Sequence, residues 1–149
     1  MNKSELRERV HSSHTRLVKS FDGLTEEEAT RVGLNPQWSI KDALAHIAAW
    51  DAQGAVIISR ILREGVEPPD IDKQFIDDFN ARAVAERGSH SMREVADEFN
   101  AAHGELENVL AEFPDELDES SRAFKLFEIL AVTHYAHHAE QIEKFRAEG

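Results

Sequence analysis

The sequence contains no cysteine among its 149 residues. Disulfide bonds, thiolate metal sites and a cysteine nucleophile are therefore excluded, and any thiol used in a reaction has to come from another molecule. Basic residues are also few, because 17 Lys and Arg stand against 29 Asp and Glu, for a formal net charge of −12. Since phosphate contacts need clustered Lys and Arg, this balance predicts that nucleic acid is not a partner, and it disfavours anionic membrane surfaces.

Long apolar runs are missing as well. The longest apolar runs are of the length of residues 55–58, Ala-Val-Ile-Ile. A run of this length is far too short to cross a bilayer. The N-terminus carries charges from Lys3 onward and lacks the apolar segment of a signal peptide. These features predict a cytoplasmic protein with no membrane partner. With 41% hydrophobic and 31% charged residues, the chain is expected to form one globular domain over residues 1–149.

Glycine and proline divide the sequence into long segments in which apolar residues recur at three- and four-residue spacing. This spacing predicts amphipathic helices, and we find no alternating pattern typical of strands. Capping residues mark several ends: Ser39 and Ser91 each precede a helix, and Gly65 follows one. The long predicted helices cover residues 4–21, 40–64, 92–113 and 121–149.

Four long amphipathic helices in a chain of this size predict an all-α four-helix bundle. A short helix is expected after Thr25, and an extra helix within residues 71–87, in the long connection between the second and third long helices. A connection of this length predicts a crossover. Residues 67–87 fit either a lid over one end of the bundle or a packed connection.

Eight histidines are present, and their positions carry most of the functional argument. His134 and His138 lie four residues apart on the apolar face of the last predicted helix, while His137 turns away from it. Two imidazoles at this spacing can chelate one metal ion without bending the backbone. On the pair alone, two ordinary core histidines are an equally good interpretation.

A third histidine favours the metal site. His46 lies among small and apolar residues on the helix that follows Ser39, so that three inward-facing imidazoles from two helices can meet. Three neutral imidazoles with one open position are typical of catalytic rather than structural zinc sites, and nickel and iron accept similar ligands. The predicted metal ligands are His46, His134 and His138.

Other residues near the predicted site are candidates for which a packing or surface role is the simpler alternative. The candidate catalytic groups are Gln141, Tyr135 and Asp51. The candidate pocket-lining residues are Trp50, His14 and His103. Asp42, one turn before His46, fits either an acceptor for an imidazole N–H or a helix cap, and we favour the cap.

Residues 38–51, WSIKDALAHIAAWD, resemble the second-helix motif of the DinB-like four-helix-bundle superfamily, and most closely its ClbS/DfsB branch. Residues 134–141, HYAHHAEQ, are similar to the last-helix motif of the superfamily, in which a His, a second His four residues on and a nearby Gln recur. Phe79-Asn80 and residues 92–110 also resemble the ClbS/DfsB branch. The resemblance covers nearly the whole chain.

This resemblance implies an up-up-down-down bundle, often a homodimer, with a divalent metal held by His46, His134 and His138. Activities of the superfamily include thiol-dependent transferases and isomerases that act with mycothiol, bacillithiol or glutathione. Members of the ClbS branch protect against a genotoxin, and some of them lack the three histidines. This chain keeps all three, which favours the metal-dependent interpretation.

Two functional hypotheses follow. The first is a metal-dependent transferase or hydrolase that acts on a small molecule, with a low-molecular-weight thiol as a further cofactor. The alternative is a binding or resistance protein that sequesters a toxic small molecule without turnover. A weaker third option is a dimeric scaffold in which the histidines are only polar core residues. Loss of metal on substitution of the three histidines separates the first hypothesis from the others.

Overall fold

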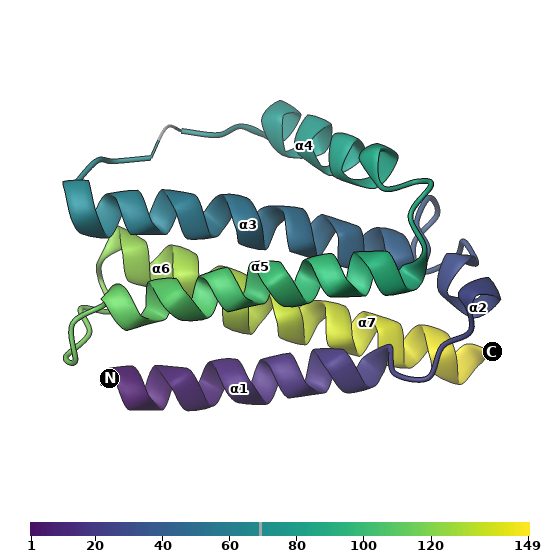
Figure 1. The fold of residues 1–149 in the computed structure, drawn as a ribbon, viewed down its shortest axis with the longest axis horizontal. Coiled ribbons are helices and arrows are strands. Elements are labelled where there is room, and N and C mark those ends of the chain that lie inside the picture. Colours follow the sequence, from purple (N-terminus) through teal and green to yellow (C-terminus); the bar gives the residue numbers. More distant parts are fainter. Residues whose placement is uncertain (69) are drawn as a thin grey trace.

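The chain folds into helices that pack lengthwise against one another (Figure 1). The computed structural model describes residues 1–68 and 70–149, and within them no strand is formed. The elements are α1 (Lys3–Ser20), α2 (Glu26–Thr30), α3 (Ile40–Glu64), α4 (Lys73–Glu86), α5 (Met92–Glu112), α6 (Arg122–Glu128), the π-helical η1 (Ile129–Thr133) and α7 (His134–Glu148). The predicted all-helical bundle is confirmed. No helix of the described part is long and apolar enough to cross a membrane.

Capping side chains explain why the helices begin where they do. Ser39 accepts a hydrogen bond from the backbone N–H of Asp42, and the Asp42 carboxylate accepts one from the backbone N–H of Ser39. Asp42 therefore has the capping role that its position favoured, and each such cap stabilises a helix by about 1 kcal/mol. Gly65 ends α3 with a left-handed backbone at φ 66°, a conformation that glycine adopts at little cost.

The last predicted helix is interrupted where the sequence gives no sign of it. Between α6 and α7 the five residues of η1 form a π-helical turn that ends directly before His134. A π turn widens the helix and changes which face the following residues present. The hydroxyl group of Ser13 in α1 donates a hydrogen bond to the carbonyl of Ala131 at 2.6 Å, so that this part of the turn is held by the neighbouring helix.

Helix direction follows from which ends share a core cluster. One buried cluster contains Leu17, Ile40, Phe99 and Ile142, and the other contains Leu6, Ile58, Leu110 and Phe124. Hence α3 and α5 run one way, and α1 and α6–α7 run the other (Figure 1). The resemblance implied the order up, up, down, down along the chain, and this order is wrong. The observed order is up, down, down, up, because the connection through α2 reverses the chain between α1 and α3.

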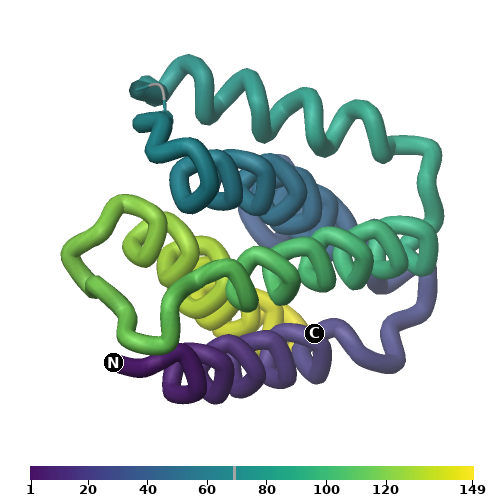
Figure 2. The backbone as a smooth tube through the Cα atoms, turned by 60° about the vertical axis from the view of Figure 1, so that its left-hand side comes forward, coloured from purple at the N-terminus to yellow at the C-terminus, as the bar shows by residue number. Residues whose placement is uncertain are grey.

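The long connection crosses back along the side of the bundle, as the tube in Figure 2 shows. It carries α4, which packs against α3 and not over an end of the bundle (Figure 1). The rings of Trp50 and Phe79 lie 4.2 Å apart between their centroids. Of the two alternatives for this segment, α4 matches the packed connection, and it covers the part of α3 that carries His46 and Trp50.

Candidate metal centre

Three histidines from α3 and α7 meet inside the bundle. The Nε2 atom of His134 lies 2.9 Å from Nε2 of His46 and 3.0 Å from Nε2 of His138. One ring nitrogen from each of the three residues lies within 4.8 Å of the others. The structure therefore brings together the three residues that the sequence analysis predicted to lie close to one another.

Hydrogen bonds on the far side of two of these rings determine where their protons lie. Nδ1 of His46 is 2.8 Å from Oδ1 of Asn80, and Nδ1 of His138 is 2.9 Å from Oε1 of Gln141. An amide oxygen only accepts, so in both rings Nδ1–H donates and Nε2 keeps its lone pair. Gln141, a candidate catalytic residue, is thus in position to orient His138.

The converging nitrogens fit a divalent cation. Two Nε2 atoms are acceptors, and His134 can offer at most one Nε2–H, so the three rings cannot satisfy one another. In a tetrahedral zinc site with bonds of about 2.0–2.1 Å, ligand nitrogens are about 3.3 Å apart. The two Nε2 pairs that include His134 are 2.9 and 3.0 Å apart, and all three nitrogens lie within 4.8 Å of one another. Nδ1 of His134 is buried and has no partner in the described part of the chain, so no hydrogen bond on the far side of this ring orients it.

Burial keeps all three rings in the form that binds metal. Desolvation, followed by the neighbouring His138 and His46, lowers the pKa of His134 to about 2. Desolvation, followed by His46, lowers the pKa of His138 to about 4. Burial also lowers the pKa of His46, against the opposing effect of its hydrogen bond to Asn80. The imidazoles are therefore neutral near pH 7, with lone pairs available to a cation.

Asn80 is the residue of this site that spacing did not identify. Its Oδ1 accepts from His46 and also, at 2.7 Å, from the indole Nε1–H of Trp50. One amide on α4 therefore fixes two side chains on α3. The only sequence signal was the resemblance of Phe79-Asn80 to the ClbS/DfsB branch, because Asn80 lies 34 residues from His46 in a separate helix.

A cavity of about 370 Å³ opens beside His46 and His134. Its walls come from α3, from α6–α7 and from the connection that carries α4. They include Trp50, Ile57, Phe75, Ile76, Ile129 and Leu130. Trp50, one turn after His46, is among its lining residues. His14 and His103, which the sequence offered as further lining residues, are not among its described walls.

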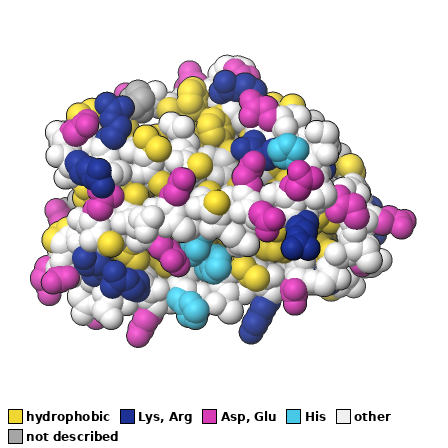
Figure 3. Space-filling view, viewed as in Figure 1, with side chains coloured by type: hydrophobic (Ala, Val, Ile, Leu, Met, Phe, Trp, Pro, Cys, Tyr) yellow, Lys and Arg dark blue, Asp and Glu magenta, His cyan; other side chains and the backbone are white. Residues whose placement is uncertain are grey.

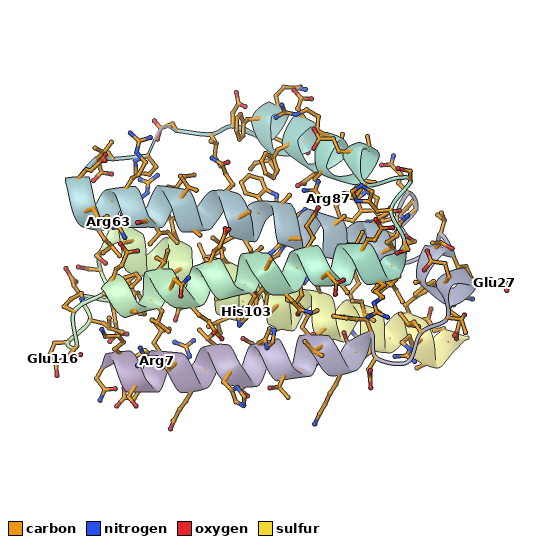
Figure 4. All side chains as sticks on the ribbon, in the orientation of Figure 1. Arg7, Glu27, Arg63, Arg87, His103 and Glu116 are labelled. Carbon is orange, nitrogen blue, oxygen red and sulfur yellow. The ribbon has the colours of Figure 1, made fainter. Side chains whose placement is uncertain are left out.

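His14 and His103 belong instead to a separate buried network with Tyr135 and Asp51. Nδ1 of His103 is 2.9 Å from the Tyr135 hydroxyl, which donates to Oδ2 of Asp51 at 2.5 Å. The rings of His14 and His103 stack with their centroids 3.8 Å apart. Figure 4 labels His103 on α5 near α1, where Figure 3 shows histidine between the two helices. Neither Tyr135 nor Asp51 lines the cavity in the described residues.

Residues 9–142 match the family model of the DinB superfamily. The chain belongs to this superfamily. No curated protein matches its sequence. Among solved structures, this chain is similar to the sibling lethal factor precursor DfsB, with a TM-score of 0.82 and 13% sequence identity. The match covers 99% of this chain and 96% of DfsB.

Two further structures share the fold. The colibactin self-resistance protein ClbS, in complex with a dsDNA, matches with a TM-score of 0.79 and 11% identity over 97% of this chain and 95% of that chain. An uncharacterised protein from Escherichia coli UTI89 matches with a TM-score of 0.79 and 13% identity, over 99% of this chain and 94% of that chain. At such low sequence identities, the similarity shows a shared fold. The predicted resemblance to ClbS and DfsB is therefore confirmed for the fold.

The exclusion of nucleic acid as a partner is wrong. It rested on the net charge of −12, yet a protein of the same fold, ClbS, forms a complex with dsDNA. Net charge describes the whole surface, whereas phosphate binding depends on where a few Lys and Arg side chains gather. Total charge therefore gives no ground for ruling out DNA.

Proposed function

We propose that this DinB-superfamily chain is a metal-dependent transferase or hydrolase of a small molecule, with one divalent cation held by His46, His134 and His138. The observation that carries the proposal is the convergence of three Nε2 atoms beside an apolar cavity. Two of the three rings, His46 and His134, also line that cavity. A molecule in the cavity would therefore lie against the metal centre.

The chain supplies positioning and an apolar environment for such chemistry. When bound, a divalent metal supplies Lewis acidity toward a carbonyl, a water or the thiol of a low-molecular-weight cofactor. Asn80 and Gln141 accept the Nδ1–H protons of His46 and His138, which holds both Nε2 atoms toward the centre. The apolar cavity walls leave few polar groups beside the reacting centre. Because the sequence has no cysteine, a thiol would have to enter as a separate molecule.

The test is the metal content of the untagged protein, measured by inductively coupled plasma mass spectrometry after incubation with zinc, nickel or iron(II). We expect about one divalent ion per chain, and its loss in the His134→Ala variant. His137→Ala is the matched control, because His137 is exposed on the same helix and is not part of the cluster. Protein that retains no metal under any of these conditions would rule out the proposal.

The second candidate is a bundle that binds a small molecule without turnover. The apolar cavity favours it independently of any metal, and ClbS, a colibactin self-resistance protein, has the same fold. Under this alternative, substitution of the histidines leaves ligand binding intact. Turnover of a bound compound that depends on both the metal and His46 would exclude it.

A further inference from the structure

The cavity beside the three histidines is long. His46 and His134 lie at one end, and Ile58 and Arg122 are also among its lining residues. Twelve residues separate His134 from Arg122, and twelve separate His46 from Ile58, which is about 18 Å along a helix. Because α3 and α6–α7 are antiparallel, these two helices line the same stretch side by side. The shape suits an elongated molecule.

The walls along this stretch are apolar and incompletely covered. Four large side chains line the cavity while remaining exposed: Ile71 at 47%, Phe75 at 42%, Ile76 at 37% and Ile129 at 55%. Large apolar side chains that surround a hollow are typical of a ligand site and not of an ordinary surface.

The end of the cavity away from the histidines carries a positive charge. Arg122 lines it, and within the described residues Arg122 makes no ion pair. No Asp or Glu is among the described lining residues. In a chain with a net charge of −12, a cation at the mouth of an apolar cavity selects for an anionic group on the ligand.

We propose that the cavity takes an elongated apolar molecule with an anionic group at one end, bound so that the anion pairs with Arg122 and the opposite end reaches His46 and His134. This inference rests on the proposed function in one respect, because it places the reacting end of the substrate at the metal centre. Binding itself depends on the apolar walls and on Arg122. It can therefore be measured with and without metal.

The test uses dodecanoate, dodecan-1-ol and dodecyltrimethylammonium as probes, titrated by calorimetry into the full chain. We expect dodecanoate to bind most tightly. Arg122→Gln is expected to weaken dodecanoate about two- to fivefold, because the lost ion pair lies at an exposed position, and to leave dodecan-1-ol unchanged. Lys125→Gln is the matched control, because it removes the same charge from the same helix at an exposed position that does not line the cavity.

Each titration is done on EDTA-treated and on zinc-treated protein. A preference for dodecanoate that depends on Arg122 in both samples supports the proposal. Equal binding of the three probes, no binding, or an unchanged affinity in Arg122→Gln would overturn it. So would dodecanoate binding that requires zinc and ignores Arg122, because the ligand would then lie in the reverse orientation. If the zinc-treated protein retains no zinc while Arg122-dependent binding persists, the enzyme proposal fails and the ligand class stands.

Discussion

The hydroxyl group of Tyr135 donates a hydrogen bond to Oδ2 of Asp51, at 2.5 Å, in the centre of the bundle. Both residues are fully buried, and the other carboxyl oxygen of Asp51 has no partner in the described part of the chain. Burial raises the pKa of Asp51 well above its usual range. This contact joins α3 to α7 at the residue that follows His134, so the pair holds together the two helices that carry the metal ligands.

Removal of the Tyr135 hydroxyl should destabilise the fold by about 1–3 kcal/mol, because it leaves a buried carboxyl group without its donor. We expect Tyr135→Phe to lower the free energy of unfolding by this amount in chemical denaturation. A double-mutant cycle with Asp51→Ala, which removes the acceptor, isolates the contact. If the two substitutions add without coupling, the hydrogen bond makes no net contribution to stability.

The stacked pair of His14 and His103 predicts a loss of stability in acid. Desolvation, followed by the neighbouring His103, lowers the pKa of His14 from 6.5 to about 4, against the opposing charge of Glu107. Below about pH 6.5 the unfolded chain therefore gains a proton that the folded chain does not, and the free energy of unfolding falls until about pH 4. Nε2 of His14 is buried without a partner among the described residues, so no acceptor stabilises the imidazolium.

Replacement of His14 should make this pH dependence shallower. We expect His14→Phe, which keeps a ring against His103, to lose less stability than the wild type between about pH 6.5 and about pH 4. The measurement is urea denaturation at a series of pH values. His11→Gln, on the exposed face of the same helix, is the control and should retain the wild-type slope. Parallel slopes for His14→Phe and the wild type would show that His14 does not control acid stability.

The features that the sequence predicted are those with a local cause. The start of α3 follows from Ser39 and Asp42, three residues apart, and the end of α3 from Gly65. The His pair on α7 follows from helical periodicity, since His134 and His138 lie one turn apart. The presence of His46 in the same cluster needed only that two apolar faces meet in a bundle.

The features that escaped prediction depend on contacts between distant parts of the chain. Asn80 reaches His46 only because α4 folds back along α3. The π turn before His134 depends on its packing against α1, where Ser13 binds the carbonyl of Ala131. For His103, periodicity left a pocket-lining role and a packed core role open, because it places the residue on an apolar face without saying which side of that face meets Tyr135.

Asn80 should act on the metal through His46. Asn80→Ala removes the acceptor for His46 Nδ1–H and for the Trp50 indole, and loss of such an outer partner typically weakens metal affinity about 10–100-fold. We expect this loss in zinc competition with a chromophoric chelator, together with a smaller loss in Asn80→Asp, which keeps an acceptor oxygen. Asp78→Ala, on the exposed part of α4, is the control. Equal zinc affinities in all four proteins would remove Asn80 from the site.

Two glycines inside helices should respond in opposite directions to the same substitution. A Cβ atom added at Gly54 in α3 would lie 2.1 Å from Cδ1 of Leu130, whereas one added at Gly104 in α5 meets nothing within 4 Å. Gly104→Ala should therefore stabilise the protein by about 0.5–1 kcal/mol, the usual gain inside a helix. Gly54→Ala should destabilise it by about 1–3 kcal/mol, because Leu130 or the helix has to move.

The same pair of variants tests whether close packing of α3 shapes the cavity. Gly54 and Leu130 both line it, so a Leu130 side chain displaced by Gly54→Ala changes the space beside His134. We expect Gly54→Ala to alter dodecanoate affinity in calorimetry while Gly104→Ala does not, and thermal unfolding gives the two stability changes on the same samples. Stabilisation by both substitutions would mean that the Leu130 side chain, whose Cδ1 is the atom in the way, turns aside at little cost. Close packing of α3 against η1 would then not limit the width of the cavity.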